Sequence, residues 1–458
     1  MLFHTWIFAL FFLIVYPVYL LIRKTRFKDI WLLIASYVFY GWWNPLYLLL
    51  IVYSTAIDYV AVIRMDRSRR KKLWLYGSVV NNLALLGLFK YAGFVTDNLN
   101  YLLAQMGLHY AIPAPGVLLP VGISFYTFQS MSYTIDFYRG QIEKEPNFIR
   151  FATFVSLFPQ LVAGPIERAK NLLPQIQKPS HISRLDITDG LSLFVVGLFK
   201  KLAMADFLAQ WVDPVYGSPG SYQAPALLFA TFAFAWQIYF DFSGYTDMAR
   251  GIAHLMGFRL MLNFNNPYLA TGLGDFWARW HISLSTWFRD YVYIPLGGNR
   301  KGTFSTYRNI FLTMVISGFW HGAAWTMIIW GALHAMGVML TRQLERSTIY
   351  REHVPKFAKQ MWVFIFVFFT WIFFRAGSLG DAWLILSRIF ASGFADPGFP
   401  LLALGLVLVI WAYQFIYDSR IKWLLSLSPV RVSMVVAMIL YIIIFSGGVE
   451  QPFIYFQF

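Results

Sequence analysis

The sequence predicts an all-α polytopic membrane protein, and three observations support this. Of its 458 residues, 58% are apolar and 13% are charged, whereas a soluble domain carries about 25% charged residues. Apolar stretches long enough to cross a bilayer recur along the whole chain. The 37 basic residues outnumber the 22 acidic ones and cluster in short loops, as the positive-inside bias predicts. We therefore expect membrane lipid around the chain and no nucleic-acid partner.

The apolar stretches divide the chain into candidate membrane segments. Asn44 and Pro45 separate two of them, because the residue before a proline is disfavoured in a helix. The stretch 307–340 exceeds the roughly 20 residues that a span needs, so we expect it to be tilted, broken or two pieces. No soluble domain or repeat interrupts the series, which predicts a single membrane domain over residues 1–458. The segments lie near residues 2–22, 30–43, 45–63, 73–92, 117–138, 148–165, 187–212, 223–255, 307–340, 357–376, 400–418 and 432–447.

Basic residues set the expected orientation. The first stretch has no Lys or Arg before it, which is typical of a retained span and not of a cleaved signal peptide. The basic cluster that follows it places the N-terminus outside. The loop at residues 64–72 is strongly basic and indicates a cytoplasmic loop. The chain has no cysteine, which excludes disulfides, thiolate metal sites and acyl intermediates on cysteine.

Two carboxylates interrupt the apolar run at residues 239–247. Polar groups at membrane depth are costly unless they are paired or face water. Asp247 is followed three residues later by Arg250 and can pair with it. Asp241 has no partner within a helical turn, so it either holds helices together or lines a polar cavity.

A second polar region follows the irregular turn at residues 263–268. Asp275 is a good N-cap that also reaches Arg279, and we expect a helix from Phe276 to about Tyr293. This helix carries His281 and is too polar to face lipid, so it lies at the interface or packs around a cavity.

The loop after this helix contains Arg300 and Lys301 next to glycines. It is either one more cytoplasmic loop or a contact for the phosphates of a charged donor.

The third polar feature is His321, which lies in an apolar run between Gly318 and Gly322. Their GxxxG spacing lets another helix approach closely, and the histidine is either a packing group or a base. His281 and His321 each follow a tryptophan. On one straight helix His334 lies about 20 Å from His321, so the two are not expected to share a metal. No HxxxH or HExxH spacing occurs, and we expect no metal site.

These motifs resemble those of the membrane-bound O-acyltransferase (MBOAT) family. The most specific stretches are FNNPYLATGLGDFWARWHISLSTWFRD at residues 264–290 and SGFWHGAAWTMIIWGALH at residues 317–334. Residues 119–140, 158–166 and 237–251 and the ending PFIYFQF fit too. The chain is most similar to the bacterial branch that O-acetylates exported polysaccharides such as alginate. It is more distantly similar to the D-alanyl transferases of teichoic acid modification.

The resemblance implies a ring of about 10–13 transmembrane helices around a thinned centre with a tunnel. The catalytic histidine of the family falls on His321 and its second motif histidine on His281. Gln160 stands where some relatives carry a histidine. The expected donor contacts are Arg300 and Lys301, and the expected lining of the tunnel or cavity is Asp241, Asp247, Asn265, Trp280 and Trp320.

The resemblance also implies the reaction. An acyl group, expected to be acetyl, passes from a cytoplasmic thioester such as acetyl-CoA to an exported polysaccharide. The expected partner is an exported SGNH-hydrolase-like protein, the expected location is the bacterial inner membrane, and no bound cofactor is expected. Neutral imidazole can act as the base. His321 fits this role, and His281 fits an orienting or oxyanion-binding role. A relay on Ser or Tyr stays open.

Two alternatives remain at this stage. One is D-alanyl transfer from a carrier protein to a cell-wall polymer. The other is a non-catalytic transporter or flippase, which would not need a histidine base.

Overall fold

The chain folds into helices joined by turns and by longer irregular segments such as residues 256–266. The computed structural model describes residues 1–108, 110–162, 164–179, 181–395, 398, 401–445, 451, 453 and 454, and within them there is no β-strand. This confirms the predicted all-α class. Contacts divide the chain into two compact units, residues 1–194 with 246–261 and residues 195–245 with 262–458. The prediction of a single membrane domain stays a prediction.

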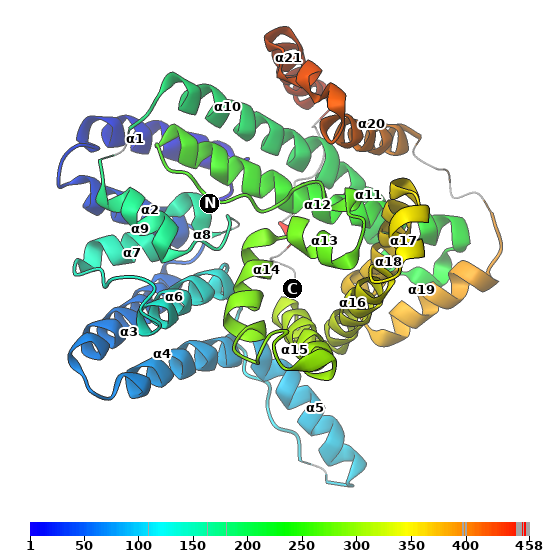
Figure 1. The fold of residues 1–458 in the computed structure, drawn as a ribbon, viewed down its shortest axis with the longest axis horizontal. Helices are drawn as coiled ribbons and strands as arrows, with labels where there is room; N and C mark the ends of the chain where they lie inside the picture. Colours follow the sequence, from blue (N-terminus) through cyan, green and yellow to red (C-terminus); the bar gives the residue numbers. More distant parts are fainter. Residues whose placement is uncertain are drawn as a thin grey trace. The chain divides into compact units, whose positions relative to one another are not determined.

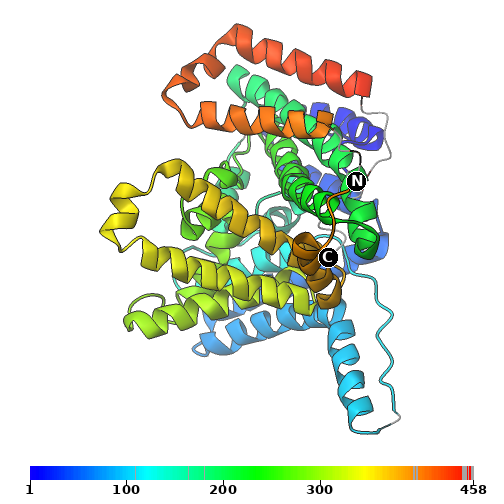
Figure 2. The same cartoon turned by 90° about the vertical axis from the view of Figure 1, so that its right-hand side faces the viewer.

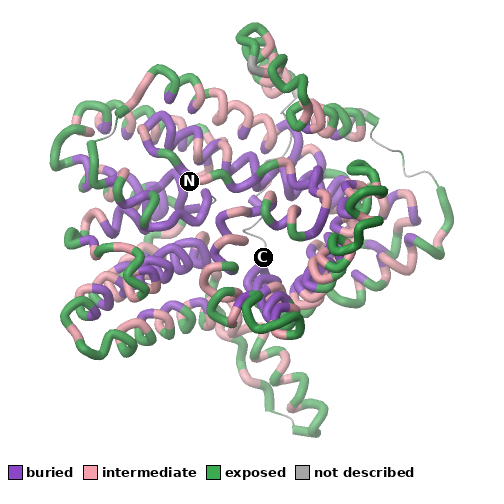
Figure 3. The backbone as a smooth tube through the Cα atoms, viewed as in Figure 1, coloured by how far each residue is buried: buried purple, intermediate pink, exposed green. Residues whose placement is uncertain are grey.

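The first unit contains the N-terminal helices and the end of α12. Its helices α3, α4 and α6 are neighbours, whereas α5 contributes no buried side chain (Figure 3). The helices are α1 (Trp6–Ile22), α2 (Lys28–Gly41), α3 (Leu48–Arg67), α4 (Lys71–Leu86), α5 (Ala92–Gln105), α6 (Ile123–Tyr138), α7 (Phe148–Ser156), α8 (Phe158–Leu161), α9 (Ala169–Gln177) and most of α10 (Arg184–Phe199).

Polar side chains connect helices inside this unit. Asp58 on α3 accepts hydrogen bonds from Ser78 Oγ at 2.5 Å and Asn82 Nδ2 at 2.9 Å, both on α4, and from Ser130 on α6. A buried carboxylate needs such donors because its desolvation is otherwise uncompensated. The sequence therefore uses one membrane-depth carboxylate to hold three helices together.

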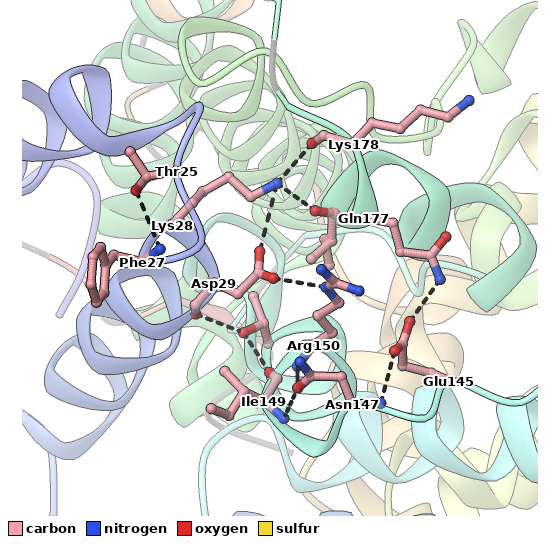
Figure 4. A network of polar contacts seen from close by, with 12 residues as sticks. Thr25, Phe27, Lys28, Asp29, Glu145, Asn147, Ile149, Arg150, Gln177 and Lys178 are labelled. Carbon is pink, nitrogen blue, oxygen red and sulfur yellow. Dashed lines mark hydrogen bonds and ion pairs between the residues drawn. The ribbon is translucent and has the colours of Figure 1, made fainter.

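A second polar network lies where α2, α7 and α9 meet (Figure 4). Asp29 at the start of α2 accepts from Arg150 Nε at 2.8 Å. Lys28 Nζ donates to the Lys178 carbonyl at 2.7 Å, and Gln177 Nε2 donates to Glu145 Oε2 at 2.6 Å. These contacts hold the end of the polar segment around residues 166–179 against other parts of the first unit.

The second unit contains the rest of the chain, including both motif histidines. In it α15, α16 and α18 lie side by side (Figures 1 and 2). The helices are α11 (Asp206–Gly217), most of α12 (Ala224–Leu255), α13 (Leu273–Arg279), α14 (Ile282–Phe288), α15 (Gly302–His321), α16 (Trp325–Leu344), α17 (Thr348–His353), α18 (Lys356–Arg375), α19 (Leu379–Ala391), α20 (Leu401–Tyr417) and α21 (Ser428–Phe445).

Two predicted boundaries are confirmed. The helices α2 and α3 are separate, and Pro45 opens a short 3-10 turn between them. The long stretch 307–340 is two helices, because α15 ends at His321 and α16 begins at Trp325.

Two other predicted boundaries are wrong. The segment expected at residues 73–92 continues to Gln105, because a π-helical turn at Gly87–Tyr91 joins α4 to α5 without a break. The single helix expected from Phe276 to Tyr293 is broken at Trp280 and His281, which separate α13 from α14.

Four described helical segments are long and apolar enough to cross a membrane. They are Pro45–Arg67, Lys71–Gln105, Ala224–Leu255 and Lys356–Arg375. The shorter apolar helices are Trp6–Ile22, Leu404–Tyr417 and Ser428–Ile444. These segments agree with a polytopic membrane protein, and the count of about 10–13 spans with a central tunnel stays a prediction.

Candidate active site

His321 is the last residue of α15. Gly322 ends the helix with extended backbone, at φ −158° and ψ 144°, and the chain turns back into α16 within three residues. The imidazole of His321 is buried. The turn therefore holds this side chain at the closed end of a helical hairpin.

Glycines bring the two helices of the hairpin into contact. A Cβ atom on Gly318 would lie 2.3 Å from the Met327 carbonyl oxygen, and one on Gly331 would lie 2.4 Å from the Met314 carbonyl oxygen. Real Cβ atoms do not approach that closely, so α15 and α16 touch backbone to backbone. The close approach expected at Gly318 is confirmed, and the glycine opposite it is Gly331, while Gly322 lies beyond the end of α15.

His281 lies at the break between α13 and α14. Its backbone is left-handed, at φ 43° and ψ 54°, a conformation that costs an ordinary residue roughly 1–2 kcal/mol. The side chain is fully buried, and its Nδ1 lies 3.1 Å from Asn263 Oδ1. Asn263 Oδ1 also accepts from the backbone N–H of Ser283 at 3.2 Å and its hydroxyl at 3.0 Å. An amide oxygen can only accept, so Nδ1 carries the proton and Nε2 is the basic nitrogen of His281.

Tryptophans connect three buried histidines. The Trp320 ring lies 6.5 Å from His281 and 5.0 Å from His321, measured between ring centroids. Trp330 lies 5.2 Å from His321 and 4.7 Å from His334. His334 Nε2 is 3.0 Å from the Thr370 hydroxyl on α18. The straight-helix estimate that separated His321 from His334 by about 20 Å is wrong, because the chain folds back after His321.

The residues around the broken helix divide into buried and exposed ones. Trp280 and Trp320 are buried, whereas Asn265 is exposed.

Asp275 lies within the first turn of α13 and is not its N-cap, a position that Gly272 occupies. The expected pair with Arg279 is confirmed, at 2.7 Å from Arg279 Nε to Asp275 Oδ1.

The two carboxylates of α12 have different partners. Asp247 lies 3.5 Å from Arg250, as the spacing predicts. Asp241 is buried, and its Oδ1 lies 2.9 Å from Nζ of Lys201, which is 40 positions earlier in the chain and equally buried. Lys201 also contacts Asp206 at 2.7 Å. Asp241 thus belongs to a buried ion cluster, and its place along a cavity stays a prediction, as does that of Asp247.

Arg300 and Lys301 lie on the exposed turn that precedes α15. Gly297, Gly298 and Gly302 have positive φ there, and Asn309 Nδ2 donates to the Gly298 carbonyl at 2.9 Å. The loop is therefore ordered by its glycines and leaves both cationic side chains in solvent. Among the described residues there is no group of three or more His, Cys, Asp or Glu side chains that could hold a metal ion.

Residues 106–379 match the family model described as the membrane-bound O-acyltransferase family. The chain belongs to this family. It is accordingly an acyltransferase and a membrane protein, as the motifs predicted, and the transporter alternative loses its basis.

Curated relatives of this MBOAT chain are named for acyl transfer to polymers. A probable alginate O-acetylase of Pseudomonas aeruginosa is 44% identical over 397 residues, which cover 86% of this chain and 75% of the relative. A peptidoglycan O-acetyltransferase of Helicobacter pylori is 36% identical over 80% of this chain and 74% of its own length. A teichoic acid D-alanyltransferase of Streptococcus thermophilus is 28% identical over 57% of this chain and 69% of its own.

The MBOAT site contains three residues that sequence reasoning did not select. Asn263 was part of an irregular turn, and its role depends on a fold that brings it beside His281. Lys201 follows Lys200 in an otherwise apolar run, where a cation is itself a signal of a buried partner. His334 was considered only as a metal ligand, although its bond to Thr370 makes it a packing contact between α16 and α18.

Proposed function

We propose that this MBOAT protein O-acetylates an exported polysaccharide with acetyl groups from a cytoplasmic thioester donor. The observation that carries the proposal is the 44% identity to a probable alginate O-acetylase over 86% of the chain. The peptidoglycan O-acetyltransferase, at 36% identity, supports the same transferred group. According to their names, the first relative acetylates alginate and the second acetylates peptidoglycan.

We assign the base to His321 and an orienting or oxyanion-binding role to His281. In the transfer, the acceptor hydroxyl oxygen attacks the thioester carbonyl, its proton passes to the imidazole, and the C–S bond breaks. The proton then returns from the imidazole to the departing thiolate. Burial of both imidazoles among aromatic rings supports this assignment, because an apolar surrounding favours the neutral form that can accept a proton.

The remaining parts of the proposal concern substrates and location. Acetyl-CoA is the proposed donor substrate, with its phosphates at Arg300 and Lys301, and no bound cofactor takes part. The acceptor side uses an exported SGNH-hydrolase-like partner. The proposed location is the bacterial inner membrane with the N-terminus outside, and the proposed lining of the transfer path is Asp241, Asp247, Asn265, Trp280 and Trp320.

The test is deletion of the gene followed by measurement of ester-linked acetate in each cell-envelope polymer. One polymer should lose its acetate, and the wild-type gene should restore it, whereas the gene with His321→Ala should not. Unchanged acetate in every polymer would overturn the proposal.

D-alanyl transfer is the second candidate, because a teichoic acid D-alanyltransferase matches over 57% of this chain. Ester-linked D-alanine measured on the same samples separates the two. Loss of D-alanine with acetate intact would favour this second candidate.

A further inference from the structure

Lys201 is the centre of a buried ion cluster in the second unit. It lies in the π-helical turn Lys200–Ala205, and its Nζ contacts Asp206 at the start of α11 and Asp241 on α12. The side chains of Lys201 and Asp241 are 1% and 4% exposed. Buried charges persist only where partners offset the cost of removing them from water. The other contacts of Lys201 and Asp241 therefore show which parts of the chain this cluster holds in place.

Two of those contacts are made by residues far along the chain. Lys201 Nζ donates to the Gln451 carbonyl at 2.9 Å. The backbone N–H of Ile454 donates to Asp241 Oδ2 at 2.6 Å. Hydrogen bonds to charged groups are stronger than neutral ones, and the cation and the anion of one pair each hold a different point of the same short segment. We call Gln451, Phe453 and Ile454 the C-terminal anchor.

The C-terminal anchor is buried against α12. Phe453 and Ile454 are 0% and 2% exposed. The Phe453 ring lies 4.4 Å from the Tyr245 ring and 5.8 Å from the Phe242 ring. Because Asp241 is one residue before Phe242, the ion pair and the aromatic contact hold the anchor on the same turn of the helix.

Phe242 connects the anchor to the candidate active site. Its ring meets the His281 imidazole edge to face, at 4.6 Å and 88°, and it also packs on Phe264 at 5.0 Å. Asn263, the hydrogen-bond partner of His281, is the neighbour of Phe264 in the chain. The series Phe453, Phe242, His281 is therefore one continuous packed row.

We propose that Lys201 and Asp241 form a clasp that fixes the C-terminal anchor beside His281, and that both are positioning residues for acyl transfer. The catalytic part of this proposal rests on the proposed function, while the clasp itself does not. With the clasp intact, Phe453 holds the Phe242 ring against the imidazole. With the clasp broken, the anchor leaves, and the Phe242 ring loses its contact with Phe453.

Cysteine labelling tests the clasp without reference to activity. The chain has no cysteine, so Ile454→Cys introduces a single thiol at a buried position. In membranes treated with N-ethylmaleimide this thiol should react slowly. Adding Lys201→Met or Asp241→Asn should raise the labelling rate at least about tenfold, because losing one partner of a buried charged hydrogen bond costs more than this factor.

Asp213→Asn is the matched control. It removes a carboxylate that pairs with Arg375 at 2.8 Å in the same unit and does not contact the anchor, so the labelling rate should not change. Equal labelling in the Lys201, Asp241 and Asp213 variants would overturn the clasp.

Polysaccharide acetylation tests the positioning role. Lys201→Met and Asp241→Asn should each lower ester-linked acetate at least about tenfold at normal protein level, and Lys201→Arg, which keeps the charge, should restore part of it. Faster labelling together with wild-type acetylation would overturn the positioning role. If the wild type acetylates no polymer, the proposed function fails and the labelling result still decides the clasp.

A pair of variants on the anchor itself covers the case in which the cluster variants do not accumulate. Ile454→Pro removes the N–H that donates to Asp241 and leaves all three charges in place, while Ile454→Ala shortens the side chain and keeps the N–H. The proline variant should lose acetylation and the alanine variant should keep most of it. Equal activities would overturn the positioning role.

Discussion

His321 is the last residue of α15, so its backbone carbonyl has no hydrogen-bond partner within the helix. Its ring is surrounded by Trp320, Trp330 and Phe374, with centroid distances of 5.0 to 5.5 Å. Contact with three aromatic rings restricts the reorientation of the imidazole. This packing suits the proposed role of His321 as a base, because it holds the imidazole in place.

We expect His321→Ala to lower polymer O-acylation by about 10²–10⁴-fold, the loss typical of a missing general base. The protein should still insert and accumulate, because the substitution leaves the Gly318 and Gly331 contact intact. Ester-linked acetate normalised to protein level measures the effect. Acylation within a factor of about three of wild type would contradict the assignment.

His281 needs a different substitution, because its backbone is left-handed. Asn tolerates this conformation better than Ala does, so His281→Asn changes the side chain with less effect on the backbone. His321 has helical backbone, so Ala is a suitable substitution at that position.

Glu167 gives the first unit a dependence on pH. Its carboxylate is buried and accepts from the Met261 N–H and from Asn171 Nδ2, both at 2.5 Å. Burial raises the pKa of the Glu167 carboxyl from 4.5 to about 7. The folded state therefore binds the proton more tightly than the unfolded state, and the stability gained from protonation is complete below pH 4.5 and lost as pH rises through 7.

We expect the melting temperature of the wild type to fall relative to that of Glu167→Gln between pH 5 and pH 8. Thermal unfolding in detergent across this range measures the difference between the two curves, which cancels the other titrating groups. Parallel curves would show that Glu167 ionises normally.

Single residues also show what the sequence could reveal and what it could not. Asp247 and Arg250 were paired correctly because a helix brings residues three positions apart together. Asp241 was recognised as unusual, but its partner Lys201 lies on another helix, and no local rule joins them. Asn263 is similar, since only the irregular chain path after α12 brings it to His281.

Two of the helix boundaries described above lie at a proline and at a glycine. Pro45 separates α2 from α3, and Gly322 separates α15 from α16, so these ends could be predicted. The break at Trp280 and His281 could not, because neither residue breaks a helix by its own preference. Contacts with other parts of the chain stabilise this break. Trp280 packs on Phe264 and Trp371, both at 5.1 Å between ring centroids, and His281 is hydrogen-bonded to Asn263.

At the scale of elements, the hairpin of α15 and α16 depends on its two facing glycines. Gly331→Ala should force the helices apart, because its Cβ would lie 2.4 Å from a backbone carbonyl oxygen. Overpacking of this kind costs about 1–3 kcal/mol. We expect a lower melting temperature and weaker acylation, with His321 displaced at the end of the hairpin.

Gly405→Ala on α20 is the matched control for this hairpin variant. A Cβ there meets no atom within 4 Å, so the substitution should leave stability unchanged or raise it by up to about 1 kcal/mol. Equal effects of the two substitutions would show that the close approach does not stabilise the hairpin.

At the scale of the whole molecule, the composition and the series of apolar segments were sufficient to predict a helical membrane protein. The order of motifs was sufficient to predict the family. The grouping of helices into units was not predictable, because it depends on which of many apolar faces pack together, and apolar faces of similar size look alike in sequence.

The donor must reach the site from one side of the membrane, and we expect that side to be the one exposing Arg300 and Lys301. Changing both to Gln should raise the apparent KM for acetyl-CoA more than it lowers kcat, because a distant phosphate contact binds substrate and transition state alike. Steady-state rates in vesicles measure this, with Lys422→Gln as a control at another exposed cation.

The side of the membrane on which this loop lies is tested with Asn299→Cys, which introduces a single thiol in the same exposed loop. A membrane-impermeant maleimide should label it in inverted vesicles and not in intact cells stripped of their outer layers. Labelling from outside would contradict the donor assignment.

The proposed donor contacts Arg300 and Lys301 and the proposed base His321 lie at opposite ends of α15. The helix begins beside Lys301 and ends at His321, and its 20 residues rise about 30 Å, close to the thickness of the hydrocarbon core of a bilayer. A donor held by its phosphates at Arg300 and Lys301 reaches His321 only through a flexible arm of comparable reach. Selectivity for the donor is then a matter of arm length as well as of the acyl group. Under the proposed donor assignment, short thioesters that lack this arm would have to leave the loop to react, so α15 would disfavour them as donors.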